Sequence, residues 1–239
     1  MRRVIALTSF LIRDLSRSLA GVVPLALALA FGLIAFEYGM DQAQFITVAG
    51  IGMGAICLVT GLVLASRANR ASSYLILARL RRRAELLAAL VLCSLLITAA
   101  LGLVVPTVNL LADRLTLDFP SALWVLPTWL PLWLLAATLA LPLSGLVERS
   151  GSHLFGYALL AGLLVANDRQ AFLSSHGLVW LARLVDSILW PMSTLVGEAS
   201  AGIHGREYLL AWGLTSAYAL LLFLLATLLF GDKDLLWSE

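Results

Sequence analysis

The residues of this sequence that could do acid–base chemistry are concentrated before its last apolar run. Carboxylates and histidines can act as general acids and bases, so a small membrane enzyme with a site in this region would use them. The candidates are Asp168, Arg169, Arg183, Asp186, Glu198, His204 and Glu207. They define one hypothesis, a membrane enzyme, which stands beside that of a scaffold that neither catalyses nor transports.

Metal and nucleophile chemistry find little support in the sequence. His153, His176 and His204 have no helical spacing that would form a metal site. Ser152 next to His153 does not make a nucleophile and its base, because adjacency in sequence gives no triad geometry. There is no phosphate-binding glycine-rich loop. We therefore expect neither catalytic residues nor a cofactor in this chain, and any work it performs would draw its energy from a partner.

The composition indicates a polytopic membrane protein. Of the 239 residues, 61% are hydrophobic and 13% are charged, and the mean hydropathy is +0.97. A bilayer core of roughly 30 Å needs about 20 apolar residues per helix, so this length suits about six spans.

The net charge of +2 is too small to suggest a nucleic-acid partner. Cys57 and Cys93 lie inside apolar runs, so we expect both to be packing residues.

The predicted fold is an all-α integral membrane protein in which residues 1–239 form a single transmembrane domain. Residues 1–17 have an apolar stripe flanked by arginines, which predicts a helix in the membrane interface. The third span should end before Pro106. The fifth, about 20 Å long as a helix, is too short to cross the hydrocarbon unaided. The six predicted spans are 19–36, 46–65, 86–105, 122–147, 154–166 and 208–230.

Glycines and prolines inside the spans suggest how the helices pack. Gly50 and Gly54 are four residues apart in the second span and would allow another helix to approach closely. Pro127, Pro131 and Pro142 predict kinks in the fourth span.

Tryptophans gather near the first end of the fourth span, at Trp124, Trp129 and Trp133. This grouping is typical of an interfacial belt, and a stacking site for an aromatic substrate is the alternative. Ionisable residues, in contrast, are almost absent from the spans. The spans 19–36, 46–65, 86–105 and 208–230 contain no Asp, Glu, Lys, Arg or His, which argues against a proton- or sodium-coupled carrier and against an intramembrane metalloprotease.

Residues 167–207 are predicted to form a pair of re-entrant or interfacial helices on the outer face, between the fifth and sixth spans. A seventh span here would place Arg183 and Asp186 near mid-membrane, where each charge costs roughly 2.5–3.5 kcal/mol on insertion scales. The two residues are three apart and can pair on one helix face. Together with Pro191 they form the candidate outer gate.

The distribution of basic residues predicts the orientation. Twelve of the 16 Lys and Arg residues fall on the side that holds both termini in the six-span arrangement. Basic residues are retained on the cytoplasmic side of a membrane, so we expect both termini in the cytoplasm and the chain in the cell's inner (cytoplasmic) membrane.

Residues 66–85, between the second and third spans, form a short, basic and amphipathic segment. A helix here would place Tyr74 and Leu77 on one face, and Ser72 or Ser73 can cap its start. The arginines behind it would anchor the third span against anionic lipid head groups. An ordinary basic loop is the alternative interpretation.

This arrangement resembles the permease subunits of type-2 ABC exporters. Those proteins have an interfacial N-terminal helix, six spans and a short cytoplasmic coupling helix at the place where this chain reads RASSYLILARLRRRAELLAAL. Their outer helical pair often contains a proline like Pro191, and they end in a cytoplasmic tail similar to residues 231–239. The chain departs from the family pattern where Ala71, Ser72 and Ser73 replace an acidic residue and a glycine, and Leu80 replaces a proline.

The resemblance implies a permease subunit without catalytic residues, which couples ATP hydrolysis to outward transport of a hydrophobic or amphipathic substrate. A separate ATPase subunit would hold ATP and Mg and dock on the coupling helix, and a second, identical or similar permease chain would complete the path. The membrane subunit of the haem exporter used in cytochrome c maturation resembles the same architecture and is the closest alternative. The implied ATPase-docking residues are Ser72, Ser73, Tyr74, Leu75, Leu77, Arg79 and Arg82.

Overall fold

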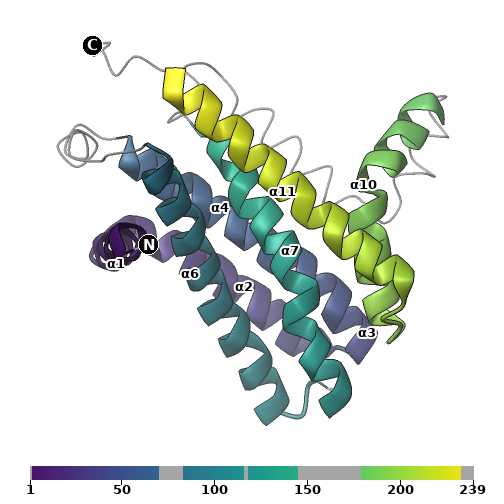
Figure 1. The fold of residues 1–239 in the computed structure, drawn as a ribbon. Coiled ribbons are helices and arrows are strands. Elements are labelled where there is room, and N and C mark those ends of the chain that lie inside the picture. Colours follow the sequence, from purple (N-terminus) through teal and green to yellow (C-terminus); the bar gives the residue numbers. More distant parts are fainter. Residues whose placement is uncertain (1, 70–82, 116–117, 145–178, 233–239) are drawn as a thin grey trace.

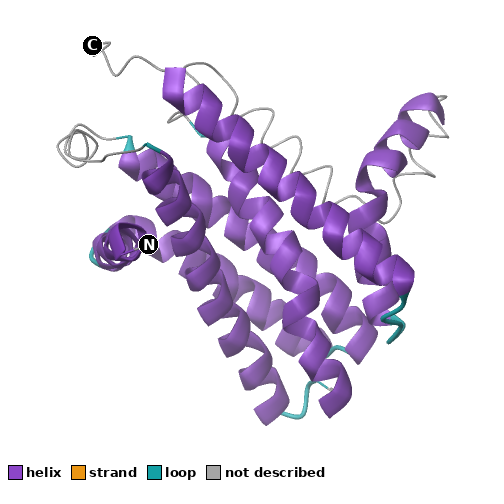
Figure 2. Cartoon of the chain, viewed as in Figure 1, coloured by secondary structure: helices purple, strands orange, loops and turns teal. Residues whose placement is uncertain are grey.

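The computed structural model describes residues 2–69, 83–115, 118–144 and 179–232, and these are almost entirely helical (Figure 2). Within these ranges there is no strand, only an isolated bridge between Met40 and Leu115. The helices are α1 (Arg2–Ser16), η1 (Leu19–Gly21), α2 (Val22–Tyr38), α3 (Gln42–Gln44), the π-helical turn η2 (Phe45–Ala49), α4 (Gly50–Ala68), α6 (Ala84–Leu111), α7 (Phe119–Leu143), α10 (Val179–Ser200) and α11 (Arg206–Asp232).

Five helical segments of the described chain are long and apolar enough to cross a membrane. They give the chain the character of a multi-pass membrane protein and match the predicted first, second, third, fourth and sixth spans in position. The predicted fifth span, 154–166, lies outside the described residues, as does the tail from residue 233. The five segments are Leu19–Tyr38, Gln42–Ala68, Ala84–Leu111, Ala122–Leu143 and Arg206–Phe230.

The helices pack as a bundle in which α4 and α7 are central (Figure 1). α4 contacts α2, α6 and α7, whereas α11 packs on α7 and α10 packs on α11. Figure 1 shows α1 end-on, so this helix lies across the others, and it packs against α6. α1 therefore has the extent and the crosswise direction predicted for the N-terminal helix.

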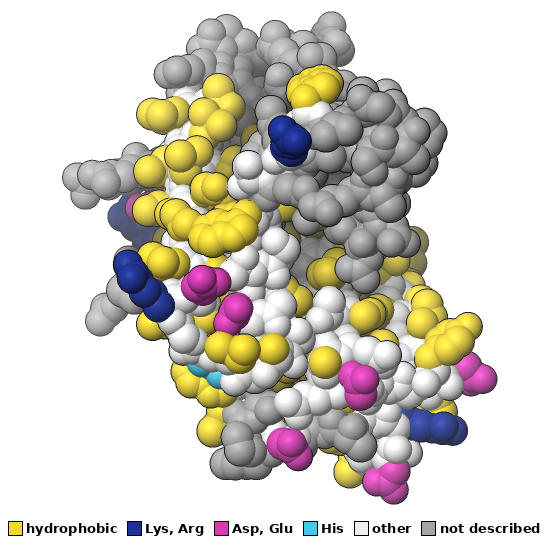
Figure 3. Space-filling view, turned by 90° about the vertical axis from the view of Figure 1, so that its right-hand side faces the viewer, with side chains coloured by type: hydrophobic (Ala, Val, Ile, Leu, Met, Phe, Trp, Pro, Cys, Tyr) yellow, Lys and Arg dark blue, Asp and Glu magenta, His cyan; other side chains and the backbone are white. Residues whose placement is uncertain are grey.

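The two ends of the bundle differ in charge. We call the end where α4 and α11 finish and α6 begins, with α1 beside it, the basic end; its described charged residues are Arg3, Arg13, Asp14, Arg17, Arg67, Arg83 and Glu85. The opposite end is mainly acidic and carries Glu37, Asp41, Asp113, Arg114, Asp118, Glu198, Arg206 and Glu207. In Figure 3 most of the visible acidic side chains lie in the lower half of the molecule, which is the opposite end.

The tryptophans of α7 correct one prediction. Trp129 and Trp133 are each only 2% exposed, whereas Trp124 is 42% exposed. The Trp129 indole nitrogen donates to the carbonyl oxygen of Ile46 at 3.0 Å. An interfacial belt is therefore wrong for Trp129 and Trp133, because α7 is a central helix and its inward face meets other helices.

Glycines provide the space for these two rings. A Cβ built at Gly50 would lie 2.7 Å from the Trp129 ring, and one at Gly102 would lie 3.1 Å from the Trp133 ring. The space at Gly50 is thus filled by a side chain of α7, not by the backbone of a closely approaching helix. Among the described residues nothing lies within 4 Å of a Cβ at Gly54, so the close approach predicted there stays a prediction. A third close approach, between Gly61 and the Cβ of Ala140 at 2.7 Å, brings α4 and α7 together.

These contacts predict that adding one methyl group to α4 changes the free energy of unfolding differently at two glycines. Gly61→Ala is expected to destabilise the bundle by about 1–3 kcal/mol, because α4 and α7 would have to move apart. Gly54→Ala is the matched control and should be neutral or stabilising by about 0.5–1 kcal/mol through reduced backbone entropy. Unfolding of both variants in mixed detergent micelles measures the difference. Equal effects would contradict the α4–α7 contact.

Two predicted helix ends are also corrected. α6 does not end before Pro106 but continues to Leu111. Pro106 removes one intrahelical donor, the one that would bond the Gly102 carbonyl, and a single lost bond of this kind is tolerated inside membrane helices. The α6 backbone near the proline also accepts side-chain bonds, from Thr107 to the Leu103 carbonyl at 2.6 Å and from Asn109 to the Val105 carbonyl at 2.8 Å. The fourth span ends at Leu143 instead of 147, because Ser144 is extended and its hydroxyl donates to the Leu141 carbonyl at 2.6 Å.

The described part of the predicted outer region contains one continuous helix, α10, followed by the start of α11. α10 passes through Pro191 and diverges from α11 towards its Val179 end (Figure 1). The first helix of the predicted re-entrant pair would fall in residues outside the described ranges, so the pair stays a prediction.

Candidate functional site at the basic end

The basic segment between α4 and α6 is flanked by two arginines, each of which contacts another helix. The predicted docking residues themselves, Ser72, Ser73, Tyr74, Leu75, Leu77, Arg79 and Arg82, lie outside the described residues. The structure describes Arg67 before the segment and Arg83 after it. These two side chains connect the flanks of the segment to other helices.

Arg67 joins the end of α4 to the N-terminal helix. Its Nε and Nη2 donate to Oδ2 of Asp14 at 2.9 and 2.6 Å. The Arg67 side chain is 17% exposed and that of Asp14 is 42% exposed, so the pair is partly shielded from solvent. A charge-assisted pair with two short bonds holds its geometry better than a single contact between two exposed side chains. Asp14 therefore connects α1 to the entrance of the segment.

Arg83 joins the start of α6 to the end of α11. Its Nη1 donates to the Phe230 carbonyl oxygen at 2.9 Å, and its guanidinium carbon lies 5.8 Å from the centroid of the Phe230 ring. The last carbonyls of a helix have no partner within the helix and carry the negative end of its dipole. A guanidinium at this position satisfies one of them and is favoured by the dipole.

α1 is seated on the bundle by a narrow buried face. Thr8, Leu11 and Leu15 are 3%, 7% and 4% exposed, whereas Ile5 and Phe10 on the remaining surface are 56% and 48% exposed. A helix with one face on protein and exposed apolar residues beside arginines is suited to the membrane interface. The segment's two ends are thus held by α1 and α11, which are distant from each other in sequence.

The predicted gate residues on α10 do not form a described cluster. Arg183 is exposed on α10, whereas Pro191 is buried. The side chain of Asp186 is outside what the structure describes, so its pairing with Arg183 stays a prediction. α10 rests on α11 through Leu195 and Ala199, which join Tyr208 in one buried cluster.

The turn between α10 and α11 is tightly built. Gly202 has φ of +71°, and Ile203 N donates to the Glu198 carbonyl at 2.8 Å, which together close α10 with a Schellman motif. His204 follows and stacks on Trp124 of α7 with ring centroids 4.1 Å apart. The ring of Tyr208 lies edge-on to that of His204, with centroids 5.1 Å apart. The Tyr208 hydroxyl is 3.1 Å from the Thr128 hydroxyl. These contacts fasten the α10–α11 turn to α7.

The acid–base candidates give no described catalytic cluster. Asp168 and Arg169 lie outside the described residues, and the ring of His204 packs between Trp124 and Tyr208. Among the residues that the structure describes, no group of three or more His, Cys, Asp or Glu could hold a metal ion. Cys57 and Cys93 are free and buried, as predicted.

Sequence reasoning missed the two anchors. Asp14 and Arg67 are 53 residues apart, and Arg83 and Phe230 are 147 apart, so no local pattern links them. No protein-family model, no curated protein and no solved structure matches the chain.

Proposed function

We propose that this chain is the membrane-spanning permease subunit of an ATP-driven ABC exporter. The observation that carries the proposal is the anchoring of the basic segment 70–82 at both ends, to α1 through Arg67 and to α11 through Arg83. Arginines at helix ends also occur in ordinary connections, but here both contact helices other than the two that the segment joins, namely α1 and α11. A segment that receives force from a partner protein needs such contacts, because the force must pass into the bundle.

α11 offers a path for that force across the molecule. It has 27 residues and is about 40 Å long as a helix, enough to reach from the basic end to the opposite end. It packs along α7, where Trp212 Nε1 donates to the Pro127 carbonyl at 3.0 Å. At its start it carries the turn to α10. Movement of Arg83 at one end would therefore shift the α10–α11 hairpin at the other.

The charge difference between the two ends supports the orientation that an ATP-driven partner requires. The basic end would face the cytoplasm under the positive-inside rule, and ATP is available there. The segment 70–82 would then be exposed to a cytoplasmic ATPase subunit that binds ATP and Mg. Both termini would lie on the same side, in the inner (cytoplasmic) membrane.

A second permease chain is part of the proposal. Much of the outward surface of α2 and α11 is apolar, with Leu33, Leu220 and Leu228 exposed by 69%, 60% and 67%. Lipid would cover part of this surface, and a similar or identical chain would cover the rest. The described spans carry few charged side chains, which suits a hydrophobic or amphipathic substrate better than an ion.

The proposal is tested by purifying the tagged full chain in mild detergent, identifying copurifying proteins by mass spectrometry and measuring ATPase activity. We expect an ATP-binding subunit to copurify with the wild type and to be lost with the double change Tyr74→Ala and Leu77→Ala. Leu111→Ala is the matched control, since Leu111 is 82% exposed at the opposite end, and it should retain the partner.

Other outcomes of this purification redirect or reject the proposal. Wild-type protein that carries no ATPase subunit would reject it and favour a membrane enzyme or scaffold. Bound haem together with an ATPase subunit would instead favour the haem exporter of cytochrome c maturation.

A further inference from the structure

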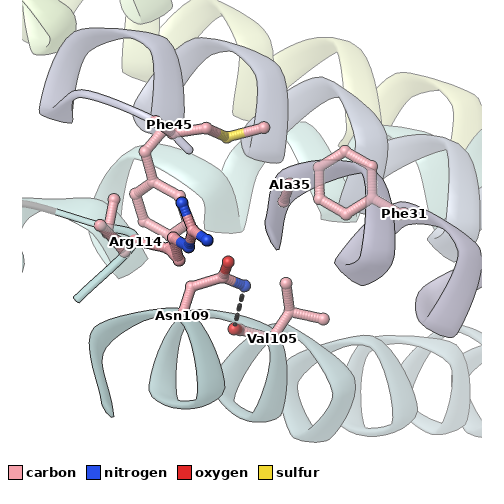
Figure 4. Close-up of a pocket in the computed structure, with 8 residues that line it drawn as sticks. Phe31, Ala35, Phe45, Val105, Asn109 and Arg114 are labelled. Carbon is pink, nitrogen blue, oxygen red and sulfur yellow. Dashed lines mark hydrogen bonds between the residues drawn. The ribbon is translucent and has the colours of Figure 1, made fainter. Parts of the chain in front are cut away.

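A small cavity lies at the opposite end of the bundle, where α2, η2 and α6 meet (Figure 4). Its volume is about 10 Å³, which is the room one water molecule needs when volume is counted at the molecule's centre. Asn109 and Arg114 bring polar groups to an otherwise apolar lining. The remaining lining residues are Phe31, Ala35, Met40, Phe45, Val105 and Leu115.

Asn109 presents an unpaired acceptor to this cavity. The residue is 5% exposed, and its Nδ2 donates to the Val105 carbonyl at 2.8 Å within α6. That bond orients the amide so that Oδ1 faces away from the helix, as Figure 4 shows. Within the described part of the chain, Oδ1 has no hydrogen-bond partner. A buried amide oxygen in apolar surroundings is strongly favoured to accept a bond.

Arg114 brings donors to the same cavity, which its side chain lines. Figure 4 shows its guanidinium on the side of Asn109 that the amide oxygen faces. The guanidinium carbon is 5.3 Å from the centroid of the Phe36 ring on α2. The Arg114 backbone is fixed on both sides, because its nitrogen donates to the Asn109 carbonyl at 2.9 Å and its carbonyl accepts from Met40 at 3.0 Å. The loop after α6 therefore fixes the Arg114 backbone, and the exposed side chain extends from it to the rim of the cavity and the Phe36 ring.

We propose that this cavity binds a single water molecule that donates to Asn109 Oδ1 and accepts from the Arg114 guanidinium. The volume excludes a phosphate or a lipid head group, and the neighbouring guanidinium disfavours a metal cation. A water in this position would join α6 to the loop that also contacts α2 and Met40. It would connect these two parts by hydrogen bonds at the opposite end of the bundle. This role is independent of the exporter proposal.

Hydroxyl-radical footprinting of the full chain in detergent micelles tests the proposal, because radicals formed from a trapped water modify the side chains around it. Phe45 lines the cavity and is 4% exposed, while Phe230 is 1% exposed at the other end of the bundle and is the matched buried control. We expect Phe45 to be labelled several-fold faster than Phe230. In Asn109→Leu, which fills the cavity and removes the acceptor, Phe45 labelling should fall to the Phe230 rate.

Two results would overturn the proposal. In the wild type, Phe45 labelling as slow as that of Phe230 would mean that no water is trapped. Unchanged Phe45 labelling in a folded Asn109→Leu variant would mean that the radicals arrive from bulk solvent. If that variant does not fold, a density map that resolves ordered water decides instead: a peak within bonding distance of Asn109 Oδ1 supports the site, and its absence rejects it.

Discussion

Replacing Trp129 by alanine is expected to lower the free energy of unfolding by about 3–5 kcal/mol, the range for emptying a buried aromatic site. The indole is 2% exposed and contacts Phe45 and Trp133 with ring centroids 5.2 and 5.5 Å away. The substitution also removes the donor to the Ile46 carbonyl, which lies in the π-helical turn η2. Detergent-induced unfolding of the purified chain, followed by tryptophan fluorescence and circular dichroism, provides the measurement.

Trp124→Ala is the matched control for this prediction, since it changes the same residue type on the same helix. Trp124 is 42% exposed, stacks on His204 and meets Tyr208 edge-on. Its loss should cost about 1–3 kcal/mol, because each of these two aromatic pairs contributes about 0.5–1.5 kcal/mol. Similar losses for the two variants would contradict the placement of Trp129 in the core.

The second large effect is expected at Arg83. Arg83→Met keeps an apolar stem against the Phe230 ring but removes the donor to the Phe230 carbonyl and the charge at the end of α11. If the exporter proposal is correct, this variant should still bind its ATPase subunit but lose most permease-dependent ATPase stimulation and transport. The physical reason is that the docking segment would no longer be connected to α11.

Hydrogen exchange separates this uncoupling from general unfolding. In Arg83→Met, amides in the last turns of α11 should exchange faster, whereas those around Trp129 should keep wild-type protection. Arg83→Lys is the conservative control; it retains the positive charge near the helix end and should recover part of the stimulation. Full stimulation in Arg83→Met would reject a role for this anchor in coupling.

Much of the helical fold was predictable because the position of a membrane-spanning helix depends on the hydropathy of consecutive residues. Twenty apolar residues in a row suffice to predict a span, and the five described spans lie where the sequence places them. The errors occurred where a local signal was overruled by neighbours. Pro106 does not end α6, and Gly50 receives the Trp129 ring, whereas no described residue packs against Gly54 four residues later.

The candidate site was only partly accessible to sequence reasoning. The basic segment 66–85 was identified by its arginines and its position between two spans. Its anchors were not, because Asp14 and Phe230 have ordinary local contexts and become partners only when α1 and α11 pack beside the ends of the segment. Asn109 was not singled out either, since one asparagine near a helix end has no distinguishing pattern.

The sequence alone determines that this chain is a helical, multi-pass membrane protein with an uneven charge distribution, because hydropathy and charge are summed over residues that are neighbours along the chain. Tertiary structure decided which tryptophans face the core, which glycines receive them, and which helices the two arginines Arg67 and Arg83 hold together. Those outcomes depend on contacts between residues far apart in sequence, such as the pairs separated by 53, 83 and 147 positions. In an apolar helix many faces are equally hydrophobic, so only packing selects the face that is buried.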